Sequence, residues 1–254
     1  MRIALTLGVA LALLFTVTSS AFWNAEPAPP LQATFEAHGG LDQWQQQATL
    51  RYTLDGFPLS PQVQKSNRSV VDLRTRKNRI EGEEFTVGFD GESAWSLPTP
   101  DAAGLPTRFF NLGSFYFIGI PFVFADPGVN VEYTGDADFQ GKSYRTYRVT
   151  FGATVGHTAE DDYVAYVDPE TDRLRLIHHS VTELSPDLRV VWAYDEYQSV
   201  NGLLVVKKLT YYPEWNDGEI AAEGAVTIVR DVELSTTAPD PQLYAAPTGA
   251  NISQ

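Results

Sequence analysis

Residues 109–125 read FFNLGSFYFIGIPFVFA and carry no charged side chain, although they hold six of the fourteen phenylalanines of the chain. The run is longer than an ordinary strand and lacks the alternation of a half-buried one. It is also short for a membrane span, and Gly113, Gly119 and Pro121 would interrupt a spanning helix. Burying six phenylalanine side chains is worth on the order of 10 kcal/mol in transfer free energy, so the rest of the fold must cover this segment.

Segments with the two-residue period of β-strands lie on both sides of this apolar run. In the first of them, Leu50, Tyr52 and Leu54 alternate with polar residues. No long helix separates these segments, which predicts an antiparallel meander, and a sheet this large must curl around its apolar face. We therefore predict a mostly β (α+β) fold: a curled antiparallel sheet or incomplete β-barrel, with short covering helices around an apolar cavity. The ten expected strands cover residues 49–55, 69–73, 85–89, 129–133, 147–151, 163–167, 173–181, 188–194, 203–211 and 226–234.

Short helices and turns complete the expected fold. Residues 31–37 have helical spacing, with Leu31, Phe35 and His38 near one face, and the two glycines that follow end this helix. Residues 41–44 begin a second turn of helix. Turns between strands are expected at residues with turn-forming chemistry, namely Asp90-Gly91, Asp136, residues 168–172, Asn201-Gly202 and Asp217-Gly218.

The N-terminus has the pattern of a secretory signal peptide. Arg2 precedes an uncharged, mostly apolar run over residues 3–17, and Ser19 and Ala21 place small residues where signal peptidase requires them. We expect residues 1–21 to be removed and the protein to be exported, with the periplasm as its location; the alternatives are an extracellular location or an N-terminal membrane anchor. The rest of the chain divides into an extended leader (22–30), a single half-barrel domain (31–235) and an irregular C-terminal tail (236–254).

Composition restricts the possible partners. The formal net charge of −14 argues against nucleic acid or anionic lipid headgroups held by electrostatic attraction. It does not argue against acyl chains, because their burial is indifferent to charge. The chain contains no cysteine, so its stability must come from a large core and not from disulfides. We expect a monomer without a cofactor.

Two acidic segments raise the question of a metal site. His157 with Glu160, Asp161 and Asp162 could bind a divalent cation, because imidazole and carboxylate ligands stand close together in the sequence. A solvated acidic loop before the next strand explains the same residues more simply. Residues 168–172 (DPETD) are acidic enough for calcium, yet their composition is first that of a hairpin turn. We therefore expect no metal site.

The remaining candidates for catalysis are few. No GxSxG, HExxH or phosphate-binding glycine loop occurs in the chain. His178 and His179 are adjacent on an expected strand, so they face opposite sides of the sheet and cannot bind one ion together. His38 stands where a helix ends, which favours a packing or capping role over that of a general base. We expect a protein that is not an enzyme, and a metal-assisted enzyme at His157, Asp161 and Asp162 ranks third among the functional hypotheses.

Four short stretches resemble bacterial secreted proteins related to outer-membrane lipoprotein-sorting proteins, the LolA/LppX-like superfamily. They are residues 35–41 (FEAHGGL) with Trp44, residues 89–91 (FDG) with Trp95, residues 115–126 (FYFIGIPFVFAD) and residues 166–171 (YVDPET). The resemblance spans residues 31–234 and implies an incomplete antiparallel barrel around an apolar cavity covered by helices. In the carrier and mycobacterial lipid-transport relatives that cavity receives acyl chains, whereas the branch most similar to this chain has no assigned function.

The apolar run then has two possible roles. In the first, it forms a mobile or semi-mobile cover of the cavity, built of short helical turns joined by bends, and the protein is a secreted or periplasmic non-enzymatic binder or carrier of a lipid-like amphiphile. In the second, it fills the cavity with its own side chains, and the protein is an envelope structural or interaction protein with another envelope protein as partner. The side chains expected to face inward and contact the ligand are Phe109, Phe110, Phe115, Phe117, Ile118, Phe122 and Phe124.

Overall fold

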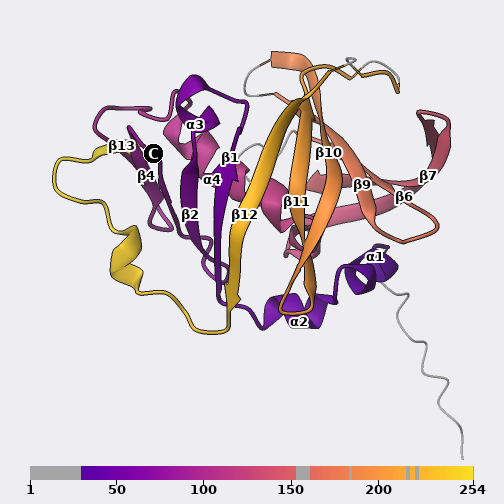
Figure 1. Ribbon diagram of the computed structural model, residues 1–254, viewed down its shortest axis with the longest axis horizontal. Coiled ribbons are helices and arrows are strands. Elements are labelled where there is room, and N and C mark those ends of the chain that lie inside the picture. Colours follow the sequence, from indigo (N-terminus) through magenta and orange to yellow (C-terminus); the bar gives the residue numbers. More distant parts are fainter. Residues whose placement is uncertain (1–29, 153–160, 183–184, 216–217, 221–222, 254) are drawn as a thin grey trace, which may run out of the picture.

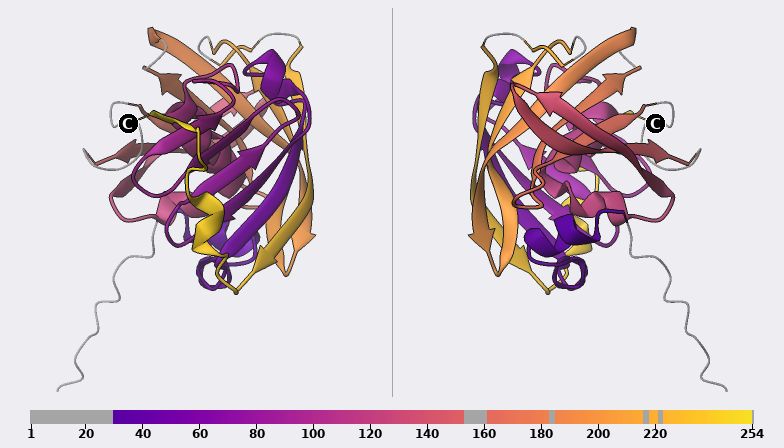
Figure 2. Two further views of the ribbon diagram at one scale, coloured as in Figure 1. Left: turned by 90° about the vertical axis from the view of Figure 1, so that its left-hand side faces the viewer. Right: turned by 90° about the vertical axis from the view of Figure 1, so that its right-hand side faces the viewer.

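One antiparallel sheet dominates the fold (Figure 1). The structure, a computed structural model, describes residues 30–152, 161–182, 185–215, 218–220 and 223–253. Within these residues thirteen strands form a single sheet whose order is β13 (Asn251–Ser253), β5 (Ala94–Leu97), β4 (Thr86–Phe89), β3 (Asn78–Glu81), β2 (Asn67–Asp72), β1 (Thr49–Asp55), β12 (Ala225–Ser235), β11 (Leu203–Tyr212), β10 (Ser185–Val200), β9 (Leu174–Val181), β8 (Tyr163–Val167), β7 (Lys142–Phe151) and β6 (Val129–Phe139). The end strands β13 and β6 do not pair with each other, so the sheet curls without closing (Figure 2). The predicted incomplete barrel is confirmed.

All ten strands expected from the alternation of side chains are present. β3, β5 and β13, which have only three or four residues each, were not predicted. β13 belongs to the C-terminal tail and joins the sheet by pairing with β5. The turn expected at Asp136 is wrong, since β6 continues through it, and the chain turns instead at Gln140 and Gly141, which have φ of 51° and 80°. Asp217, where another turn was expected, lies outside the described residues.

The helices are short apart from one. Those before the sheet, α1 (Gln32–Ala37) and α2 (Leu41–Gln45), lie where the sequence predicted them. The others are α3 (Pro61–Gln64), α4 (Thr107–Gly119) and the 3-10 helices η1 (Phe122–Ala125) and η2 (Pro241–Tyr244). No helix of the described residues is long and apolar enough to cross a membrane.

The apolar run is organised differently from the prediction of short turns joined by bends. Its first part forms α4, a continuous helix of 13 residues that passes through Gly113. A helical glycine costs only about 1 kcal/mol, which the packing of the neighbouring phenylalanines offsets. Pro121 does end the helix, because the residue before a proline avoids the helical region, and Ile120 is extended with ψ of 136°.

α4 lies inside the curl, against the concave face of the sheet (Figure 2). Polar contacts fix it there at both ends. Near its start, Asn111 donates from Nδ2 to the Gly88 carbonyl at 3.3 Å, and Asn78 donates to the Asn111 carbonyl at 3.0 Å. Near its end, the Tyr194 hydroxyl donates to the Phe117 carbonyl at 2.9 Å. These bonds connect α4 to the sheet near both of its ends.

A second, smaller apolar cluster covers the convex face of the sheet. It gathers Phe139, Tyr144 and Tyr166 with the partly buried Trp215. His178 joins this side by stacking on Trp215 at 4.4 Å, whereas His179 stacks on Tyr163 and contacts Phe117 on the concave side. The prediction that these two histidines face opposite sides is confirmed.

The glycines after α1 allow this helix to dock on the β10–β11 turn. Gly39 and Gly40 both have positive φ, 103° and 97°, but a Cβ on Gly39 would lie 2.3 Å from the Gly202 carbonyl oxygen, while a Cβ on Gly40 would meet nothing within 4 Å. Both alanine variants carry backbone strain of about 1–3 kcal/mol. For Gly39→Ala we expect a further loss of about 1–3 kcal/mol in the free energy of unfolding, because the added Cβ overpacks against the Gly202 carbonyl. Urea unfolding of the two variants measures the difference, and equal losses would contradict this docking contact.

Candidate ligand cavity

A cavity of about 700 Å³ opens where α2, η1 and the β2–β3 turn approach β6 and β7. We call it the main cavity. Its volume is within the range of about 300–1,000 Å³ found for small-molecule sites. The apolar side chains that line it come from separate parts of the chain, among them Leu41, Trp44, Leu73, Leu112, Phe115 and Phe122.

Short-range structure places the aromatic part of this wall. The glycine pair after α1 lets the chain reverse into α2, which presents Trp44 to η1. Trp44 and Phe122 stack with their ring centroids 4.8 Å apart and their planes 10° apart. Trp44 is only 5% exposed and Phe122 2%, so the stack is a rigid side of the cavity.

An ion pair borders the same cavity. Arg76 donates from Nη2 to both carboxylate oxygens of Asp126, at 2.6 and 2.5 Å, and its guanidinium lies 5.1 Å from the centroid of the Phe115 ring. Burial raises the pKa of Asp126 above its usual value, and the Arg76 charge opposes that shift. About 30% of each side chain is exposed, so the pair stands between the apolar wall and solvent.

Four residues that line the main cavity each have a buried polar atom without a hydrogen-bond partner among the described residues. These atoms are Gln47 Oε1, Arg76 Nη1, Asn78 Oδ1 and the Tyr116 hydroxyl oxygen. A buried polar group left unpaired costs about 1–3 kcal/mol, so such groups are uncommon in a finished core. The four atoms are themselves inaccessible to solvent, so they mark side chains beside the cavity whose polar groups are incompletely paired.

A second space of about 110 Å³, which we call the inner chamber, lies between α4 and strands β8 and β9. Phe109, Gly113 and Phe117 line it from the helix, and His179 and Tyr163 from the strands. Burial lowers the pKa of His179 to about 4, so its imidazole is neutral at pH 7.

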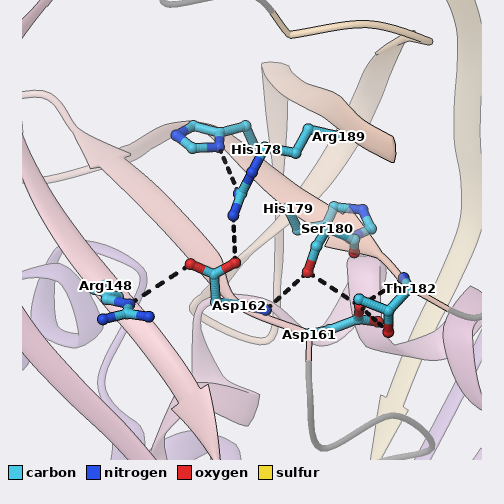
Figure 3. Close-up of polar contacts among 8 residues, drawn as sticks. All are labelled: Arg148, Asp161, Asp162, His178, His179, Ser180, Thr182 and Arg189. Atoms are coloured by element: carbon cyan, nitrogen blue, oxygen red, sulfur yellow. Dashed lines mark hydrogen bonds and ion pairs between the residues drawn. The ribbon is translucent and has the colours of Figure 1, made fainter. Parts of the chain in front are cut away.

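The acidic residues near the inner chamber are engaged in structural contacts (Figure 3). Asp161 accepts hydrogen bonds from the Ser180 hydroxyl at 3.0 Å and from the backbone N–H and hydroxyl of Thr182, both at 2.9 Å. Asp162 pairs instead with Arg189 at 2.5 Å and with Arg148 at 3.5 Å. The two carboxylates therefore have different partners and do not converge on one point.

The other members of the hypothetical metal site, His157 and Glu160, lie outside the described residues. Across the described part of the chain, no group of three or more histidine, aspartate or glutamate side chains is placed to hold a metal ion. His38 is a packing group, as expected. It is fully buried, donates from Nδ1 to the Thr34 carbonyl at 2.7 Å and meets Tyr197 edge-on at 5.0 Å.

The structure divides the seven predicted ligand-contacting residues into three sets. Phe115 and Phe122 line the main cavity, and Phe109 and Phe117 line the inner chamber. The other three, Phe110, Ile118 and Phe124, are buried in the core and line neither space.

The lining residues that sequence reasoning missed come from other elements. Trp44 stood in a motif that carried the family resemblance, and its three-residue spacing from Leu41 indicated a shared face of α2. Asp126 is the last residue of another such motif, residues 115–126, whereas Arg76 stands 50 residues away and carried no local signal. Tyr116 lies within the apolar run itself but was not among the predicted ligand contacts.

Comparison with known proteins identifies the fold. The profile of a family of unknown function (DUF6503) matches residues 105–206, and no curated protein matches the chain significantly. A LolA superfamily protein from Nitrosomonas europaea is similar in structure, with 11% sequence identity, a TM-score of 0.50, and coverage of 85% of this chain and 97% of that one. A DUF1329 family protein from Desulfovibrio piger follows, with 11% identity, a TM-score of 0.46 and the same coverage. The fold that the resemblance implied is thus confirmed, and this chain has a LolA-like fold.

Proposed function

We propose that this protein is an exported, non-enzymatic binder or carrier of a lipid-like amphiphile. The observation that carries the proposal is the main cavity, which joins an apolar wall to a partly exposed ion pair at its border. The apolar chain of the ligand would lie against Trp44, Leu73 and Phe115, and its polar end near Arg76 and Asp126. Burial of methylene groups, at about 0.8 kcal/mol each, would supply most of the affinity.

The polar border restricts the kind of headgroup. Arg76 and Asp126 neutralise each other and offer a donor and an acceptor together, while the exposed Arg74, which also lines the cavity, adds one positive charge. A headgroup with hydroxyl or amide groups fits this arrangement. The net charge of −14 is in keeping with such a headgroup, because it gives no long-range attraction for an anionic one.

The alternative, a structural protein with a self-filled interior, is supported by α4. Phe110, Ile118 and the bonds of Asn111 and Tyr194 make the helix a permanent filling of part of the curl. We infer that α4 is a wall of the binding site and not a lid that opens. Export is supported by the apolar N-terminal pattern of residues 1–21. As a carrier, the protein would receive its ligand from another envelope protein or deliver the ligand to one.

The experiment combines lipid extraction with a blocking variant. Mass spectrometry of an organic extract from natively purified protein identifies any bound amphiphile, and displacement of a polarity-sensitive hydrophobic dye measures affinity. Ala125 is partly buried and lines the main cavity, so Ala125→Trp should fill the space and weaken dye binding about tenfold or more. Ala250 is equally half-buried but lines neither space, which makes Ala250→Trp the matched control.

Two results would reject the proposal. One is an extract without lipid together with no dye binding by the wild-type protein, which would leave the structural alternative. The other is dye binding that both tryptophan variants weaken equally, because the dye would then occupy some other surface.

A further inference from the structure

The main cavity and the inner chamber are neighbours that share part of one wall. Leu112, Tyr116 and Phe151 line both spaces. The Tyr116 ring meets the Phe151 ring at 5.9 Å and the Tyr163 ring at 5.7 Å, and those two rings meet each other at 5.3 Å. We call these three side chains the aromatic partition. Because Phe151 and Tyr163 come from strands of the sheet and Tyr116 from α4, the partition lies where the helix meets the sheet, between the two spaces.

Tyr116 is the member of the partition that fits its position least well. Its hydroxyl is buried without a hydrogen-bond partner among the described residues, although a tyrosine in a finished core ordinarily has one. A phenylalanine would make the same ring contacts without burying that oxygen. The ring contacts of Tyr116 stabilise its closed position, and the unpaired hydroxyl destabilises it.

Space for movement lies beside this ring. Side chains of an α-helix lean toward the N-terminus, so Tyr116 covers the turn that contains Leu112 and Gly113. A Cβ added to Gly113 would meet nothing within 4 Å, and Gly113 itself lines the inner chamber. The absent side chain at position 113 thus leaves room on the chamber side of the partition.

The inner chamber alone is too small for an amphiphile. Its volume of about 110 Å³ is well below the lower end, about 300 Å³, of small-molecule sites. Its walls are mostly apolar and include Phe109, Phe117 and Val181, and its polar lining consists of Tyr116, Tyr163, the neutral ring of His179 and the hydrogen-bonded Asp161. As an extension of the main cavity, by contrast, it would lengthen the path available to an apolar chain.

We propose that Tyr116 is a gate between the two spaces and thereby sets the length of apolar chain that the protein accepts. Short chains occupy the main cavity, and longer chains move the Tyr116 ring aside and continue into the inner chamber. The inference rests on the proposed binding of an amphiphile and names the residue that determines which chain lengths are bound.

A series of saturated monoacylglycerols from decanoyl to stearoyl tests the gate, with affinities measured by dye displacement. Each buried methylene is worth about fourfold in affinity. Tyr116→Ala opens the passage, so the ratio of stearoyl to decanoyl affinity should rise about tenfold or more, with little change for decanoyl. Gly113→Leu occupies the chamber and should lower the same ratio. Tyr212, a half-buried tyrosine of the convex face, provides the control Tyr212→Ala, which should keep the wild-type ratio.

The outcomes separate the gate from the binding function. Equal changes at every chain length, or a wild-type ratio in both Tyr116→Ala and Gly113→Leu, would overturn the gate while leaving lipid binding in place. If the wild-type protein binds no member of the series and yields no lipid on extraction, the proposed function fails and the gate fails with it. Thermal unfolding of each variant confirms that the compared proteins are folded.

Discussion

Phe110→Ala is expected to lower the free energy of unfolding by about 3–5 kcal/mol, the usual cost of deleting a buried phenylalanine ring. Phe110 is 1% exposed, and its ring meets those of Phe57 and Phe85 at 6.3 and 6.0 Å. The hydrogen bonds that hold α4 on the sheet oppose any shift of the helix that would close the resulting void. Urea unfolding followed by circular dichroism measures the loss.

Phe109→Ala is the matched control, because it deletes the same ring one residue away. Phe109 is half-buried and faces the inner chamber, so its loss enlarges an existing space and should cost less than half as much as that of Phe110. Similar small losses in both variants would mean that α4 can detach or repack, and the view of α4 as a fixed wall would have to be replaced by that of a mobile lid.

Acidification from pH 7 to pH 4 is expected to destabilise the protein strongly. Burial lowers the pKa of His38, His178 and His179 to about 4 each, against 6.5 for a free imidazole. Their unfolded forms take up protons below pH 6.5 while the native forms stay neutral, so the stability present above that pH is lost as the pH falls toward 4. Each shift is worth about 3 kcal/mol, and the three together about 10 kcal/mol, which is comparable to the whole stability of a typical domain.

Urea unfolding at several pH values measures this dependence. Asp126 acts in the opposite direction, because burial raises its pKa and its protonation at low pH therefore favours the native state. It is one group against three histidines. His178→Phe keeps a ring against Trp215 and removes one of the three titrations, so it should reduce the loss between pH 7 and pH 4 by about one third. Tyr166→Phe, on the same convex face, should leave the loss unchanged. A stability that is flat over this range would show that the three imidazoles are not buried in the native protein.

The sheet could be predicted from the sequence because its signal is local. Alternation such as that of Leu50, Tyr52 and Leu54 is repeated in ten segments, and each became a strand. The strands that were missed are held by neighbours and not by their own pattern. β13 has three residues and is defined by its pairing with β5, about 155 residues earlier in the chain.

The cavity could be predicted only as a property of the fold, because its walls are assembled from distant segments. Five of the six phenylalanines in the apolar run are buried, but composition cannot distinguish those that line a space, such as Phe115, from those that fill the core, such as Phe110. Which of these phenylalanines line a space depends on how α4 is rotated about its own axis relative to the sheet. The Arg76–Asp126 pair likewise exists only because the β2–β3 turn and the end of η1 meet in space.

The open sheet also affects how copies of this protein meet one another. A barrel has no free edge, whereas β6 is the last strand here and presents backbone groups to which another strand can add. Its exposed side chains include Glu132, Asp136 and Asp138, and its pairing with β7 is irregular between Tyr133 and Gly135. Two copies joining by this edge would align like charges along an irregular strand. We therefore expect the acidic edge to oppose the addition of a strand from a second copy.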